Sequence, residues 1–122
     1  METTFFKFET HLVGCRHYPD SPPKVGKYVQ LVREPLNPYD TFAIAVCPLD
    51  SGAKYGHIPK DVAKLLAPII DHYDISIIAK YGGEFDGFSG IIRITIASLD
   101  NAEDDHLARL FRKITKVEMA KY

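Results

Sequence analysis

The residues best suited to chemistry lie in one short stretch in the middle of the chain, residues 33–40 (REPLNPYD). Two prolines restrict the backbone there, and Tyr39 is followed directly by Asp40 at the start of a predicted strand. An aromatic ring offers a face on which a nucleotide base stacks. A carboxylate repels phosphate and accepts a hydrogen bond from a free sugar hydroxyl. The pair therefore indicates recognition of the end of a nucleic-acid strand rather than of its interior.

Two further segments carry side chains of complementary chemistry. Residues 14–18 end the first predicted strand, and residues 56–60 precede a predicted helix, whose free N–H groups favour phosphate. Together with the central stretch they supply stacking rings and cations, the combination that single-stranded nucleic acid requires. The candidates are the rings Tyr39, Tyr18 and His17, the phosphate partners Arg16 and Lys60 with His57 as a further one, and the hydroxyl acceptor Asp40.

The same residues also have a purely structural interpretation, which the sequence leaves open. In it, Asp40 caps the loop and Tyr39 packs on the body of the domain. His57 is then a hydrogen-bonded core histidine, while Arg16 and Lys60 are ordinary solvated charges.

Three blocks of the sequence resemble the HIRAN domain family: residues 13–18 (VGCRHY), 33–44 (REPLNPYDTFAI) and 55–63 (YGHIPKDVA). The resemblance covers roughly residues 5–98. It implies an OB-like barrel, found alone or fused to SWI/SNF-type translocases, that binds single-stranded DNA at a free 3′-hydroxyl during repair or replication. It also implies that Tyr39 stacks on a base, that Asp40 senses the 3′-hydroxyl, and that Asn37, Arg16, His57 and Lys60 lie near the bases and backbone.

Three positions depart from the family pattern that the resemblance implies. His17 stands where a stacking tyrosine is expected, Leu36 replaces a polar residue, and Phe42 replaces a common asparagine. An imidazole ring still stacks on a base, but more weakly, and it titrates near neutral pH.

The elements that must position these residues are predicted from hydrophobic periodicity and turn residues. Strands are expected over residues 4–13, 28–33, 42–47, 54–58, 74–80 and 91–96, with a glycine-rich aromatic loop at 81–90. A helix is predicted to begin at Pro59, and Pro68 is expected to kink it or divide it. An amphipathic helix is predicted over 102–121, with an apolar stripe of Leu107, Leu110, Phe111, Ile114 and Val117.

This order of elements does not alternate strand with helix, which disfavours a parallel sheet. We expect a mostly β (α+β) fold, a small OB-like or SH3-like antiparallel barrel of about six strands with a helix between the fourth and fifth. The barrel domain is predicted to cover residues 1–98. Residues 99–122 form a C-terminal helical extension that packs on the barrel or on a partner subunit.

Composition sets further bounds. The chain has 122 residues, 46% of them hydrophobic and 25% charged, which suits one globular domain. A net charge of −1 excludes a protein that binds polyanions by bulk charge. The N-terminus lacks the apolar segment of a signal peptide, and no membrane partner is expected. Cys15 and Cys47 are interpreted as buried thiols in a cytoplasmic protein, nucleoid-associated in a bacterium or nuclear in a eukaryote.

Three classes of function follow from these patterns. The preferred hypothesis is a non-catalytic module for single-stranded nucleic acid, DNA favoured, with no cofactor. The alternative is a protein-interaction adaptor that forms a homo-oligomer through its C-terminal helix. A metal-dependent nuclease built on Asp40, His57 and Asp61 is disfavoured. Such enzymes bring several carboxylates to the ion, and the sequence shows no such cluster around these residues and no zinc motif.

Overall fold

The computed structural model describes residues 2–18, 23–50, 53–83, 89–114 and 118–121. Within these ranges two α-helices are present, α1 (Lys60–His72) and α2 (Asp104–Phe111), and two short 3-10 helices, η1 (Cys15–His17) and η2 (Asn101–Glu103). The strands are β1 (Thr4–Val13), β2 (Tyr28–Arg33), β3 (Ile44–Pro48), β4 (Gly56–His57), β5 (Ile75–Gly83), β6 (Ser89–Ser98) and β7 (Glu118–Lys121).

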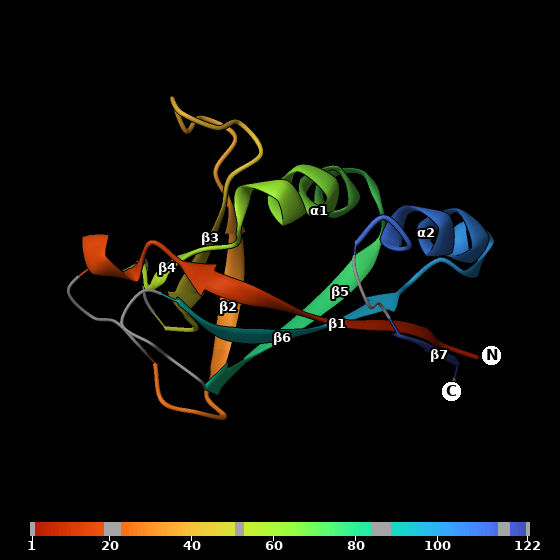
Figure 1. Ribbon diagram of the computed structural model, residues 1–122. Helices are drawn as coiled ribbons and strands as arrows, with labels where there is room; N and C mark the ends of the chain where they lie inside the picture. The colour runs from red at the N-terminus through yellow and green to blue at the C-terminus, as the bar shows by residue number, and fades with distance from the viewer. Residues whose placement is uncertain (1, 19–22, 51–52, 84–88, 115–117, 122) are drawn as a thin grey trace.

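The strands form one antiparallel sheet that closes on itself (Figure 1). Its order is β4-β3-β2-β5-β6-β1-β7, and β4 also pairs with β1. This additional pairing joins Val13 to His57, so the first six strands make a closed barrel and β7 extends β1 outside it. The small antiparallel barrel with a helix after the fourth strand, predicted from the order of elements, is confirmed.

The alternation of side chains along β1 explains how the sequence builds the barrel. Phe6, Phe8 and Leu12 are buried, whereas the intervening Lys7 and Glu9 face solvent. Since successive side chains of a strand point to opposite faces, this period of two puts one apolar row into the barrel. Side chains from the neighbouring strands complete the core, including Ile92, Ile94 and Ile96 of β6 and the uniformly buried Ile44–Pro48 of β3.

Helix α1 follows β4, and its apolar face closes the core with Ala63, Leu66, Ala67 and Ile69. Pro68 lies inside this helix, which remains one element from Lys60 to His72. The predicted division of the helix at that proline therefore does not occur. No helix within the described ranges is long and apolar enough to cross a membrane. Cys15 and Cys47 are both buried, as their sequence context predicted, and both are free thiols in the structure.

Both ends of the loop predicted over residues 81–90 belong to strands. Tyr81 belongs to β5, where its ring is buried, and the register of β5 against β6 shifts between Tyr81 and Gly83. Ser89 and Gly90 begin β6. Phe85 and Phe88, which were expected to cover the barrel end or to offer another stacking face, lie outside the described residues.

The C-terminal helix predicted over residues 102–121 was too long. Residues 101–103 form η2, α2 ends at Phe111, and residues 118–121 form β7 on the edge of β1. Val117 of the predicted stripe lies outside the described residues. Phe111 stacks on Phe6 with 4.6 Å between the ring centroids. Leu107, Phe111 and Ile114 are buried in the core, so the apolar side chains offered for a partner subunit already pack within the chain.

Candidate functional site

The connection between β2 and β3, residues 34–43, is a tightly hydrogen-bonded loop. The amide of Glu34 donates to the carbonyl of Ala43 at 3.0 Å, and the amide of Ala43 donates to the carbonyl of Asp40 at 3.1 Å. Pro35 and Pro38 fix two further backbone angles within it. The loop therefore presents Tyr39 and Asp40 from a restrained backbone.

Asn37 and Asp40 use their side chains to shape this loop, as side chains of this type do in turns. The amide oxygen of Asn37 accepts hydrogen bonds from the N–H groups of Tyr39 at 2.9 Å and Asp40 at 3.2 Å. Oδ1 of Asp40 accepts from the N–H of Phe42 at 2.9 Å. The capping role of Asp40 in the structural interpretation is thus correct. Its Oδ2 makes no hydrogen bond with any residue that the structure describes.

Arg33, the last residue of β2, anchors the loop from below. Its guanidinium donates to the carbonyls of Ala43 at 2.8 Å and Thr41 at 3.0 Å. The same group forms a two-pronged ion pair with Asp71 of α1, with both N–O distances at 3.0 Å. The planar arginine fork suits such bidentate contacts. Arg33 therefore connects the loop to both β2 and α1.

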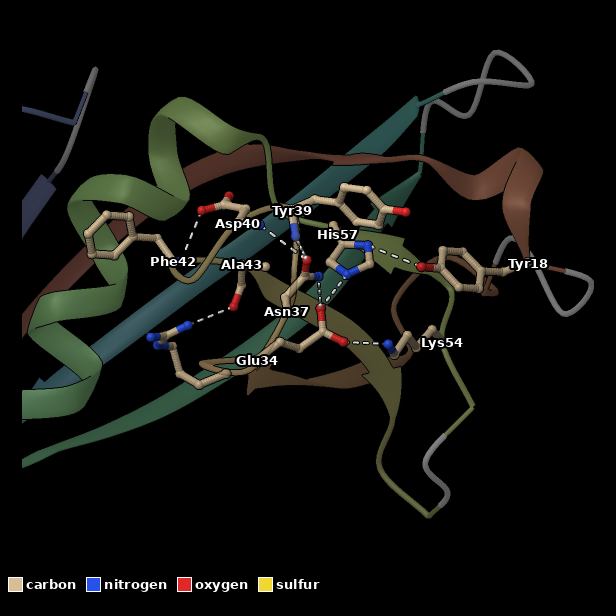
Figure 2. A network of polar contacts seen from close by, with 10 residues as sticks. Tyr18, Glu34, Asn37, Tyr39, Asp40, Phe42, Ala43, Lys54 and His57 are labelled. Carbon is tan, nitrogen blue, oxygen red and sulfur yellow. Dashed lines mark hydrogen bonds and ion pairs between the residues drawn. The ribbon is translucent and has the colours of Figure 1, made fainter.

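Tyr39 does not pack on the barrel. Its side chain is 91% exposed, and that of the neighbouring Leu36 is 94% exposed. In Figure 2 the Tyr39 ring and the Asp40 carboxylate leave the loop in different directions, the ring on the side of His57. The structural interpretation is therefore wrong for Tyr39, which offers an open ring face.

Glu34 is the centre of a polar network that joins three parts of the chain (Figure 2). One carboxylate oxygen accepts from Nε2 of His57 in β4 at 2.6 Å and from the Asn37 amide at 3.4 Å. The other oxygen pairs with the Lys54 ammonium group, which lies in the connection between β3 and β4. The Glu34 side chain is only 15% exposed, so these contacts are shielded from water.

The contact between Glu34 and Lys54 shifts the pKa of both groups. Partial burial by itself raises the pKa of the Glu34 carboxyl, but hydrogen bonds from Lys54, His57 and Asn37 outweigh it and lower the pKa below its usual value. The hydrogen bond to Glu34 raises the pKa of the Lys54 ammonium. Glu34 therefore stays ionised and Lys54 stays charged at neutral pH.

Tyr18 contacts the same network from the segment that follows β1. Gly14 takes a left-handed conformation with φ of 76°, which turns the chain into η1. Tyr18 then places its hydroxyl 3.4 Å from Nδ1 of His57, with 5.8 Å between the two ring centroids. His17 is exposed. The backbone of Arg16 lies in η1, and its side chain is outside the described part of the structure.

The structure thus places most of the predicted site residues in one connected network, although some are linked only through Glu34. Tyr18, His57 and Asn37 are joined through Glu34, and Asn37 holds the backbone of Tyr39 and Asp40. Lys60 begins α1 three residues after His57 and is exposed. Among the described residues, no group of three His, Cys, Asp or Glu side chains could hold a metal ion.

Two residues of the network, Glu34 and Lys54, were not singled out from the sequence. Glu34 stands inside the central stretch, and its position at the end of a predicted strand was the available signal. Lys54 carried no signal, because its partner lies 20 residues away and only the pairing of β3 with β4 brings the two together.

Comparison with solved structures shows which folds this chain resembles. The chain is similar to the crystal structure of the HIRAN domain of human HLTF, with 26% identity and a TM-score of 0.80 over 94% of this chain and 96% of that one. It is also similar to the HLTF HIRAN domain determined by NMR in its DNA-bound conformation. There the identity is 27% and the TM-score 0.74, over 92% of this chain and 90% of that one.

Two curated proteins of Arabidopsis thaliana match a shorter segment of 67 residues, 55% of this chain. One is a Fanconi-associated nuclease 1 homolog, with 37% identity. The other is a putative SWI/SNF-related matrix-associated actin-dependent regulator of chromatin, subfamily A member 3-like 1, with 42% identity. The match spans only 7% of either relative's length. The model of the HIRAN domain matches residues 5–84 of this chain. The chain therefore belongs to the HIRAN domain family.

Proposed function

We propose that this chain is a non-catalytic nucleic-acid binding module that recognises single-stranded DNA at its 3′ end. The observation that carries the proposal is the open ring of Tyr39, 91% exposed on a restrained loop that also carries the carboxylate of Asp40. The similarity to an HLTF HIRAN domain in a DNA-bound conformation supports DNA as the ligand. The two plant relatives, by name a nuclease homolog and a chromatin regulator, support a setting in DNA repair or replication.

Tyr39 provides the stacking contact in this proposal. A base that stacks on an aromatic side chain contributes about 1–3 kcal/mol to binding. Because the loop is already held by Arg33 and Asn37, little conformational freedom is lost when the base arrives. Tyr18 and His17 offer further rings at the end of β1.

Asp40 provides the selectivity for a free strand end. Its Oδ1 is fixed by the Phe42 amide, which leaves Oδ2 to accept a hydrogen bond from a terminal 3′-hydroxyl. A continuing strand or a 3′-phosphate would bring negative charge against this carboxylate. Arg16 and Lys60 are the proposed partners of the backbone phosphates, with Asn37 near the bases. His57 supports the site through its contacts with Glu34 and Tyr18. Two buried free thiols fit a reducing compartment, the cytoplasm, with its nucleoid, or the nucleus.

The test is a fluorescence anisotropy titration with short single strands that end in a free 3′-hydroxyl or in a 3′-phosphate. We expect tighter binding to the free hydroxyl. Binding should weaken with salt, with a slope of about −1.4 to −2.1 in log K against log salt if two or three phosphates are contacted. Equal, millimolar binding of both strands contradicts end recognition, and no binding of either contradicts the proposal as a whole.

Variants with matched controls separate the two roles. Tyr39→Ala should weaken binding by about 5- to 150-fold, the equivalent of one stacked base. Asp40→Asn keeps an oxygen for the Phe42 amide but loses the charge, so the preference for the free hydroxyl should fall towards one. Tyr28→Ala removes an exposed tyrosine of β2, whose ring lies under the Lys80 ammonium group of β5. Asp105→Asn removes an exposed acid on α2. Both controls should bind like the unmodified chain.

A further inference from the structure

Glu34 stands between the two ring-bearing segments of the proposed site. Towards β1, its carboxylate holds His57, which in turn meets the Tyr18 hydroxyl. Towards the loop, it accepts from Asn37, which holds the amides of Tyr39 and Asp40. We infer that Glu34 is a positioning residue that sets the orientation of the His57 and Tyr18 rings relative to the Tyr39 loop. This inference rests on the function proposed above and adds to it a residue that touches no nucleotide.

The contact with His57 also decides which ring nitrogen carries the hydrogen. An ionised carboxylate only accepts, so the hydrogen lies on Nε2, which is 2.6 Å from Glu34. In the neutral ring Nδ1 is then an acceptor, and it faces the Tyr18 hydroxyl at 3.4 Å. The carboxylate therefore fixes the ring of His57 and, through it, gives Tyr18 a defined partner. This is how a second residue orients a functional histidine in other sites.

The environment of Glu34 argues against direct contact with nucleic acid. Its side chain is 15% exposed, and both oxygens are taken by Lys54, His57 and Asn37. A phosphate would be repelled by the carboxylate if it approached. The Lys54 ammonium, which is more exposed, balances this charge inside the network. Glu34 is thus placed to act through its neighbours.

Nuclear magnetic resonance of the free protein tests the inference without any ligand. In the unmodified chain we expect a ring N–H signal of His57, coupled to Nε2 and protected from exchange with water. Glu34→Gln retains an accepting oxygen and should keep a weakened signal, whereas Glu34→Ala should lose it. A neutral His57 with its hydrogen on Nδ1 in the unmodified chain overturns the inference, and this result does not depend on whether any variant folds.

Oligonucleotide binding supplies the second readout. We expect a loss of up to about fivefold for Glu34→Ala, less than for removal of a whole stacking ring, and a smaller loss for Glu34→Gln. If Glu34 acts through His57 and Tyr18, Glu34→Ala and Tyr18→Phe combined should cost less than the two single losses multiplied. Glu9→Gln is the matched control, since it removes an acid from the exposed ion pair with Arg93.

The outcomes separate this inference from the proposed function. The inference is overturned, and the proposed function stands, under the following result. The unmodified chain binds the oligonucleotide, Tyr39→Ala binds it more weakly as expected, and Glu34→Ala binds it with unchanged affinity. If the unmodified chain binds no oligonucleotide, the function fails, and the His57 signal alone decides whether Glu34 orients that ring. Equal losses in Glu34→Ala and Glu9→Gln would show a general charge effect and would also overturn the inference.

Discussion

Gly56 lies where β4 meets β1, and replacing it with alanine tests whether this meeting point holds the barrel closed. A Cβ atom at position 56 would overlap the carbonyl oxygen of Val13 and come within 2.9 Å of the Leu12 side chain. Val13 is the residue that pairs with His57 to close the barrel. The two strands cannot keep their present separation in Gly56→Ala, because the obstacle is backbone rather than the end of a flexible side chain.

The expected cost follows from these contacts. Overpacking a well-packed core costs about 1–3 kcal/mol, and a backbone obstacle places this change at the upper end. Weakened pairing of Val13 with His57 adds about 1 kcal/mol for a lost hydrogen bond. We therefore expect the free energy of unfolding to fall by about 3–4 kcal/mol. For a chain of this size, that corresponds to a melting temperature lower by roughly 10–20 °C.

Urea unfolding followed by circular dichroism measures this change, with Gly82→Ala as the matched control. At Gly82 the nearest atoms to an added Cβ belong to the side chains of Ile91, at 3.1 Å, and Arg93, at 3.4 Å, and both can move. The control should lose less than about 1 kcal/mol. If Gly56→Ala is as stable as Gly82→Ala, the contact of β1 with β4 is not what closes the barrel.

Two further predictions concern the core and the Glu34 network. Phe111→Ala should reduce the free energy of unfolding by about 3–5 kcal/mol, because the ring is 1% exposed and stacked on Phe6. Urea unfolding beside the exposed Met119→Ala checks this, and equal stability of the two variants would contradict it. The network should also make stability depend on pH. The pKa of Glu34 is lowered in the folded chain, so its contribution is complete above the unfolded value near 4.5 and is lost as the pH falls through the folded value. The difference in unfolding free energy between the unmodified chain and Glu34→Gln should shrink between pH 7 and pH 3, and a difference that grows on acidification would refute this assignment.

The barrel was predictable because its strands carry local signals. Phe6, Phe8 and Leu12 alternate with polar residues, and this period alone placed β1 at residues 4–13. The C-terminal segment shows the limit of such signals. The spacing of Leu107, Phe111 and Ile114 predicted a helix that continued to residue 121, but residues 118–121 pair with the edge of β1. That pairing joins positions more than 100 residues apart, so no local pattern announces it.

The candidate site likewise has one part that local sequence predicts and one part that depends on long-range strand pairing. The exposed ring of Tyr39 and the turn formed by Asn37 and Asp40 follow from prolines and turn residues that are adjacent in the sequence. The network around Glu34 does not, because Lys54 and His57 are brought to it by the pairing of β3 with β4. Sequence reasoning named His57 for its own chemistry and could not tell that its Nε2 is already bound.

The pairing of Thr4 with Lys121 has a practical consequence for handling the molecule (Figure 1). Thr4 and Lys121 lie at one end of the barrel. Val13, at the other end of the ten-residue strand β1, pairs with His57. At about 3.3 Å per residue, the two ends are roughly 30 Å apart. A dye or a resin linker attached near Thr4 or Lys121, or fusion to another protein there, would leave the Tyr18 and His57 rings unobstructed. Folds with neighbouring ends also tolerate circular permutation and insertion into other proteins.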